Sequence, residues 1–298
     1  MNASNTELPA RLSRALRALL YVLVGLTFIA GTQLFVLAEE TDELWSWEID
    51  SAMTAAFVGA GFWSAAVITY WAARQRDWVR ARVPVPTILI VATLLLIATL
   101  DHIDTFQGLL GLAWIEVYAL FAPIMIALVV RQLAFGGSNT HSGAHVPSPL
   151  RAAYALQAVA LIVVGTLLFV GSADLRADIW PWELTPLTAK AVGTWLIGIG
   201  VIAGYIALFD DRADVPGNSV AYLVLSIVSF LGLARFGDEV DFSSVSGVLF
   251  VAFLVSVLLA GLYGALLSLR EGRYAPVLEP GGVPVELRQG NPPGPGGA

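Results

Sequence analysis

Two short acidic clusters hold the residue types whose spacing best suits a binding site. They lie 137 residues apart in the chain and consist of Asp101, His102 and Asp104, and of Asp238, Glu239 and Asp241. In each cluster two aspartates are three residues apart, so they share one face if a helix continues through them. If the clusters meet, their oxygen and imidazole groups would surround a cavity suited to a divalent or other small cation. The plainer alternative is that carboxylates at the ends of apolar segments only face water or headgroups.

Glu116 is the one acidic residue that lies well inside an apolar run. An ionisable group at membrane depth is costly and usually faces the interior of a helix bundle or a cavity. Arg235 is one candidate partner for it there. If the helix begins only near residue 112, however, Glu116 lies one turn in and reaches the membrane interface.

Lys190 is the only lysine of the chain. A lone lysine inside a bundle could form a Schiff base with retinal. Lysine is scarce throughout this arginine-rich sequence, however, and Lys190 is close enough to a span end to extend its amine to the interface. We therefore expect it to pair with Glu183 or with a carboxylate of the acidic clusters, and we do not predict retinal.

Tryptophans gather near the same expected membrane interface, in two Trp-x-Trp pairs and one further position. Their positions are Trp45, Trp47, Trp180, Trp182 and Trp114. An aromatic belt at the headgroup level is the usual reason for such an arrangement. The alternative is a platform on which a sugar or a quaternary amine stacks beside the acidic residues.

The composition is that of a multi-pass membrane protein. The 298 residues are 57% apolar and 13% charged, with a mean hydropathy of +0.75, whereas soluble domains carry about 25% charged residues. A water-soluble enzyme is thereby excluded. The absence of cysteine excludes disulfides and thiolate metal sites. With His102, Met53 and Met125 as the available axial ligands, haem is not expected, and no basic patch suits nucleic acid.

Apolar runs predict an all-α membrane protein with eight transmembrane helices. Arginines near the span ends strongly favour one side of the membrane, with 13 basic residues on that side and three on the other. Because basic loops stay inside, we expect both termini to be cytoplasmic and the acidic loops to be outside, in the plasma (inner) membrane. The predicted spans are 18–38, 51–73, 83–100, 106–130, 152–172, 188–209, 218–234 and 245–269.

The chain contains an internal duplication. Trp45, Trp47 and Glu48 recur 135 residues later as Trp180, Trp182 and Glu183, each set being followed by a Thr-Ala pair and a glycine. We also pair Gly25 with Gly165. Each half has an even number of spans, so the two four-helix repeats are parallel. The predicted organisation is an interfacial segment at 1–17, repeats at 18–133 and 150–273, a linker at 134–149 and a disordered Pro/Gly-rich tail at 274–298.

The second copy of this motif resembles a group of bacterial multi-pass membrane proteins that are themselves uncharacterised. Its pattern is W-x-W-x-aliphatic-x-P-L-T-A-x-x-x-G, carried here by Trp180, Trp182, Pro186, Leu187, Thr188, Ala189 and Gly193. The first copy departs from it, with Ser51 and Ala52 where proline is expected. The resemblance implies a multi-pass membrane protein and no activity, ligand or catalytic residue.

Three classes of function are compatible with the sequence. We favour binding or transport of a cation or small polar solute at an outer acidic cleft between the repeats, because short spans at corresponding positions of two halves point to such sites. The alternative is a non-catalytic scaffold or subunit of a larger membrane complex, since the spans hold few polar groups. An enzyme is the least favoured class. A divalent cation is the only cofactor considered, and the bilayer and other membrane proteins are the expected partners.

Overall fold

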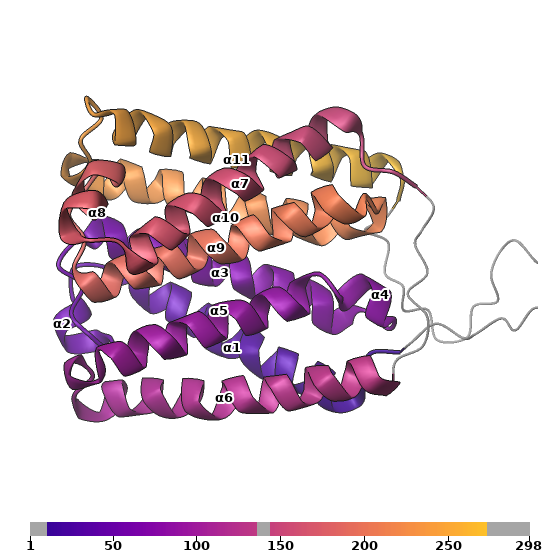
Figure 1. Ribbon diagram of the computed structural model, residues 1–298, viewed down its shortest axis with the longest axis horizontal. Helices are drawn as coiled ribbons and strands as arrows, with labels where there is room; N and C mark the ends of the chain where they lie inside the picture. Colours follow the sequence, from indigo (N-terminus) through magenta and orange to yellow (C-terminus); the bar gives the residue numbers. More distant parts are fainter. Residues whose placement is uncertain (1–10, 136–143, 273–298) are drawn as a thin grey trace, which may run out of the picture.

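The structure, a computed structural model, describes residues 11–135 and 144–272. Within these ranges eight helices are long and apolar enough to cross a membrane, which confirms the multi-pass architecture. In chain order they are α1 (Arg14–Val36), α3 (Ala52–Arg74), α5 (Pro84–Asp101), α6 (Gly108–Phe135), α7 (Ser148–Val170), α9 (Pro186–Phe209), α10 (Val215–Phe236) and α11 (Val245–Arg270). The long helices lie side by side as one bundle (Figure 1).

The interfacial helix expected at 1–17 is described only from residue 11, and its last residues are continuous with the first span. Ser13 caps α1 through a hydrogen bond that its hydroxyl accepts from the Leu16 amide, and the transmembrane helix itself begins at Arg14. A side-chain cap of this kind supplies an acceptor that the first turn of a helix lacks. Residues 1–10, much of the predicted linker and the tail lie outside the described residues.

Short elements connect the long helices, and their order in the second half repeats that of the first. A short helix follows both α1 and α7, a single turn precedes both α5 and α10, and a 3-10 turn follows them. These short elements are α2 (Thr41–Leu44), α4 (Trp78–Ala81), η1 (Ile103–Thr105), α8 (Ala173–Ile179), η2 (Arg212–Asp214) and η3 (Gly237–Glu239).

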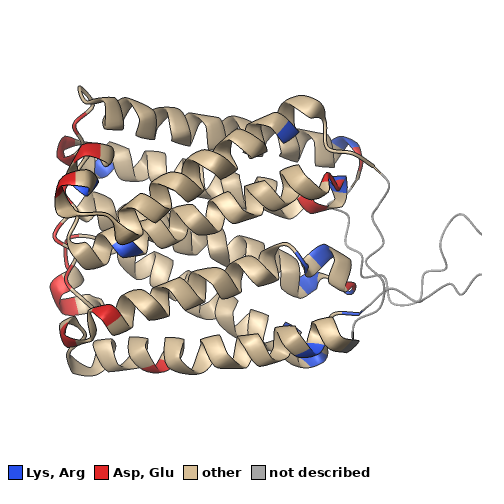
Figure 2. Cartoon of the chain, in the orientation of Figure 1, with Lys and Arg blue, Asp and Glu red and all other residues tan. Residues whose placement is uncertain are grey.

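The two ends of the bundle carry opposite charge. Figure 2 shows acidic residues concentrated at the end that holds α2 and α8, which we call the acidic end. Most basic residues lie at the other end, beside α4, which we call the arginine end. Both described ends of the chain, near Arg11 and Gly272, also lie at the arginine end.

Helices α3 and α9 form the centre of the bundle and are the most buried of the eight. The most extensive contacts join α1 to α3 and α7 to α9. Each central helix also packs on a helix of the other half, α3 on α10 and α9 on α5, while α6 and α11 pack on α5 and α10. Neither half therefore buries its own central helix alone.

Glycine pairs bring the most extensively packed helices into backbone contact. A Cβ on Gly193 would lie 2.5 Å from the carbonyl oxygen of Gly165, and a Cβ on Gly59 would lie 3.1 Å from that of Gly31. Small residues allow such close approach between membrane helices. Gly25, which we paired with Gly165 in the sequence, makes no such contact: nothing lies within 4 Å of its Cβ position, and it is Gly31 of the same helix that contacts Gly59.

We expect Gly193→Ala to lower the free energy of unfolding by about 1–3 kcal/mol, because the new methyl group meets backbone that cannot move aside. Gly25→Ala is the matched control, since the same methyl group enters open space. Thermal unfolding in nanodiscs measures both variants. Equal behaviour of the two would show that the α7–α9 crossing tolerates the added group.

Candidate functional site

The two acidic clusters lie at the same end of the bundle but enter separate contacts. Asp101, the last residue of α5, forms an ion pair with Lys190 in the first turns of α9. Glu239 instead contacts the start of α3. No group of three or more His, Cys, Asp or Glu side chains among residues 11–135 and 144–272 could hold a metal ion. The described side chains, as they stand, therefore offer no shared metal site.

Glu239 caps the N-terminus of α3 across the boundary between the two halves. Its carboxylate accepts hydrogen bonds from the Ser51 hydroxyl at 2.5 Å and from the backbone amides of Ala52 at 3.1 Å and Met53 at 3.3 Å. The first amides of a helix lack acceptors within the helix, and the helix dipole favours an anion there. The carboxylate that was expected to bind a cation thus also supports the start of a central helix.

The remaining members of the clusters have local contacts or face outward. Asp241 accepts hydrogen bonds from the hydroxyl of Ser243 at 2.6 Å and from its amide at 3.0 Å, and these bonds lower the pKa of its carboxyl. His102 is half-buried, with Nδ1 at 3.1 Å from the carbonyl oxygen of Ala98. Asp104 and Asp238 are exposed.

Glu116 does not face the bundle interior, and Arg235, one candidate partner for it, has other contacts. Its side chain is exposed, on α6. Arg235 instead donates a hydrogen bond to the carbonyl oxygen of Phe35 at 2.7 Å and lies 4.6 Å from the ring centre of Phe236. Arg235 therefore joins α10 to the acidic end of α1.

The tryptophans lie inside the bundle, so the expected aromatic belt is wrong for them. Trp45, Trp47 and Trp114 form one cluster, in which Trp47 and Trp114 have ring centres 5.0 Å apart. Trp180 and Trp182 form a second cluster with Phe57 and Phe250. The five indole-bearing residues are only 5–8% exposed. Belt tryptophans face headgroups, whereas these fill the space beneath the acidic loops.

A cleft of about 460 Å³ opens between the first turns of α3 and α9. Glu239 and Trp182, both singled out from the sequence, line it together with Asp50 and Glu183. The described residues that line it include three carboxylates and four hydroxyl groups but no basic side chain. The hydroxyl groups belong to Ser51, Thr54, Thr185 and Thr188.

Trp182 has a fixed orientation in this cleft. Its indole Nε1 donates a hydrogen bond to the Thr54 hydroxyl at 2.7 Å, which joins the loop before α9 to α3. Thr185 caps α9 by accepting a hydrogen bond from the Thr188 amide. The walls of the cleft are therefore held by hydrogen bonds between and within the two halves, while Asp50 and Glu183 are exposed at its edge.

A buried ionic cluster at the arginine end is not predicted by the sequence. Arg82 Nη2 lies 3.2 Å from Asp211 Oδ2 and 3.6 Å from Asp214 Oδ2. The three side chains are at most 6% exposed. Because 129 residues separate Arg82 from Asp211, no local spacing pointed to this contact, which joins the α4–α5 connection to the α9–α10 connection.

Asp210, the residue that ends α9, gathers a second set of contacts at the arginine end. It binds Arg151 at 2.8 Å, His145 at 2.9 Å and the Val146 amide at 2.9 Å. Although partial burial raises the pKa of its carboxyl, the bonds to His145 and Val146 and the charge of Arg151 bring that pKa below its usual value. Asp210 thus joins the end of the predicted linker, just before α7, to the end of α9.

Comparison with known proteins adds no assignment. No family model matches the chain, and no match is found among the curated proteins or the solved structures.

We expect Arg82→Met to lower the free energy of unfolding by about 3–5 kcal/mol, because it removes the positive charge that lies beside two buried carboxylates. Adding Asp211→Asn and Asp214→Asn should recover part of this loss by removing both charges. Arg80→Met, at an exposed arginine of the same connection, is the control. Denaturation in detergent or nanodiscs measures the series, and a parental stability for Arg82→Met alone would contradict the ionic cluster.

We expect Glu239→Ala to lower the free energy of unfolding by about 1 kcal/mol, the usual effect of losing a helix cap. Asp238→Ala changes the neighbouring exposed carboxylate and should have no effect. Hydrogen exchange of the first turn of α3 should accelerate only in the Glu239 variant. Equal exchange in the two variants would show that the cap does not hold this turn.

Proposed function

We propose that this protein binds a small organic cation, such as an amine, in the cleft between α3 and α9, with the acidic end outside and both termini in the cytoplasm. The observation that carries the proposal is a cleft lined by three carboxylates and no described basic side chain. Carboxylates attract a cation, and the fixed face of an indole adds a cation–π contact. The carboxylates are distributed around the cleft, which suits an organic cation better than a metal ion, because a metal ion needs several ligand atoms directed at the same position.

The position of the basic residues at the acidic end supports this choice. Lys190 is paired with Asp101, Arg235 is hydrogen-bonded to the backbone of Phe35, and Arg176 to that of Leu168. None of the three lines the cleft. The surplus of acidic over basic residues at this end therefore gives the cleft an attractive potential for cations.

The proposal includes a second element, namely that the chain consists of two four-span repeats. The position of the cleft agrees with this architecture. The two halves have the same order of elements. In each half the central helix packs on a helix of the other half, α3 on α10 and α9 on α5. In each half two glycines also bring the central helix into backbone contact with its neighbour. Ser51 and Thr54 then correspond to Thr185 and Thr188, so the cleft lies between equivalent helix starts. Transport would be the extension of such binding, since ligand sites at repeat interfaces are common in carriers.

The scaffold function keeps one observation in its favour. Glu116 is exposed on α6 about 12 Å from the start of that helix, counted at 1.5 Å per residue. A carboxylate facing lipid at this depth is costly, and a basic group of a neighbouring membrane protein would stabilise it. This alternative needs no ligand in the cleft.

We expect tetramethylammonium or putrescine to raise the unfolding temperature of the protein in nanodiscs at low salt. Asp50→Asn with Glu183→Gln should weaken the affinity at least threefold, because each exposed carboxylate contributes a modest attraction. The control variant Asp174→Asn with Asp178→Asn removes the same charge from α8, away from the cleft. An equal loss in the control would assign the effect to general surface charge and contradict a cleft site.

A further inference from the structure

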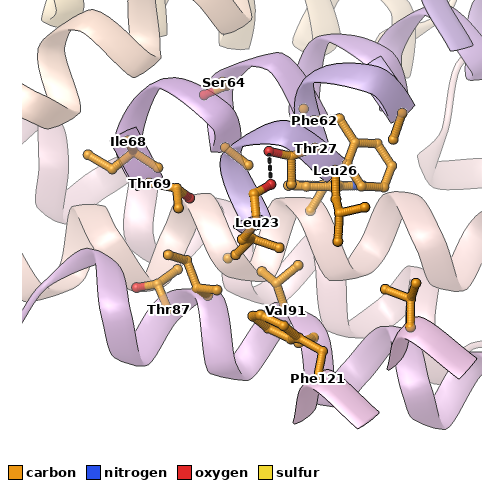
Figure 3. Close-up of a pocket in the computed structure, with 18 of the residues that line it drawn as sticks. Leu23, Leu26, Thr27, Phe62, Ser64, Ile68, Thr69, Thr87, Val91 and Phe121 are labelled. Carbon is orange, nitrogen blue, oxygen red and sulfur yellow. Dashed lines mark hydrogen bonds between the residues drawn. The ribbon is translucent and has the colours of Figure 1, made fainter. Parts of the chain in front are cut away.

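A second cavity, of about 260 Å³, lies inside the first half of the bundle and is separate from the cleft. We call it the intramembrane cavity. Side chains from α1, α3, α5 and α6 converge on it, among them Leu23, Thr69, Val91 and Phe121 (Figure 3), and residues of α9 and α10 close it from the other half. Its lining extends from Trp45, near the acidic end, to Pro84, the first residue of α5 at the arginine end. The cavity is therefore elongated along the bundle axis.

The walls of this cavity are suited to an uncharged molecule. No Asp, Glu, Lys or Arg is among the described residues that line it. The hydroxyls of Thr27, Ser64 and Thr87 each donate a hydrogen bond to a backbone carbonyl oxygen, so they are already satisfied. A charged ligand would have no countercharge there and would lose its hydration.

Five other polar groups in the lining residues have no hydrogen-bond partner within the described structure. They are Nε1 of Trp45, Nε1 of Trp195, Nδ2 of Asn218 and the hydroxyls of Thr69 and Tyr222. Each of these residues is more than nine-tenths buried. A buried donor without an acceptor is unfavourable. The indole and amide nitrogens only donate, and the hydroxyls can donate as well. These groups call for a ligand that supplies acceptor oxygens, which is the chemistry of a carbonyl group.

The opening of the cavity faces the lateral surface of the bundle. Leu26 and Ile29 on α1 and Leu110 on α6 line it while being 39%, 57% and 39% exposed. Helices α1 and α6 touch each other over a much smaller area than α1 and α3 do. In a membrane this face meets lipid, so a molecule dissolved in the bilayer can enter between α1 and α6.

We propose that the intramembrane cavity binds a neutral, mostly apolar molecule from the bilayer and recognises it through a carbonyl oxygen. Two sources share this chemistry, namely a membrane quinone and the acyl ester of a phospholipid. The proposal does not depend on cation binding in the cleft, because the two sites share no lining residue.

Tryptophan fluorescence provides the test, since Trp45, Trp114 and Trp195 line the cavity. The protein in nanodiscs is titrated with menadione, a small naphthoquinone, and is separately reconstituted with phosphatidylcholine brominated on one acyl chain. Ala113→Phe fills the cavity from α6, and Ala119→Phe places the same ring on the same helix outside the cavity lining. If Ala113→Phe does not fold, Ala65→Leu fills the cavity from α3.

We expect saturable quenching by at least one probe, weakened at least tenfold by Ala113→Phe and unchanged by Ala119→Phe. The probe that behaves in this way identifies the source as quinone or acyl ester. Quenching by both probes that is insensitive to Ala113→Phe, or no saturable quenching at all, would overturn the proposal.

A second comparison tests recognition of the carbonyl group. Thr69→Val removes an unpartnered hydroxyl, whereas Thr87→Val removes one that already binds the backbone of its own helix. Losing one hydrogen bond should weaken binding about two- to tenfold in Thr69→Val or in Trp195→Phe, and Thr87→Val should bind as the parent does. Unchanged affinity in both Thr69→Val and Trp195→Phe would overturn the carbonyl assignment.

Discussion

The close approach of helices at paired glycines is the constraint on which the rest of this structure depends. At Gly31–Gly59 and Gly165–Gly193 the backbones of neighbouring helices touch. Since apolar side chains gain little from leaving lipid for a membrane bundle, close van der Waals packing is the main attraction available there. The two crossings fix α3 and α9 against α1 and α7, and they leave the free faces of these central helices to meet α10 and α5. The cleft at the acidic end is formed where the first turns of α3 and α9 lie beside each other.

Polar contacts between the halves are concentrated at the ends of the bundle, as the low dielectric of the bilayer requires. Lys190–Asp101 and Glu239–Ser51 join the halves at the acidic end, and Arg82–Asp211 joins them at the arginine end. Between these levels the contacts are mainly apolar, and the hydroxyls bond mostly to backbone carbonyls of their own helices. This division leaves the intramembrane cavity without charge and the cleft with an excess of acid.

The sequence predicted the long helices well, because runs of apolar residues are a direct consequence of lipid as a solvent. It also identified Glu239 and Trp182, which line the cleft. It could not show that Glu239 reaches Ser51 or that Arg82 reaches Asp211, since these partners are 188 and 129 residues apart and no local pattern joins them. Their position along the spans predicts these tryptophans at the lipid interface, yet the four in the loops and Trp114 on α6 lie buried inside the bundle. Gly25 and Gly31 both lie in α1, and only the position of the neighbouring helix α3 determines which of the two glycines makes the contact.

Because each central helix packs on a helix of the other half, the order in which the chain is synthesised affects how it folds. Helix α3 is complete at residue 74, but its partner α10 begins only at residue 215. At the usual rate of translation, about 5–20 residues per second, roughly 7–28 s pass between the two. During that time the inner face of α3, with its small side chains, lies against lipid or against the insertion machinery. The first half therefore enters the membrane as an open structure, and the ribosome must finish most of the second half before the core of the protein can close.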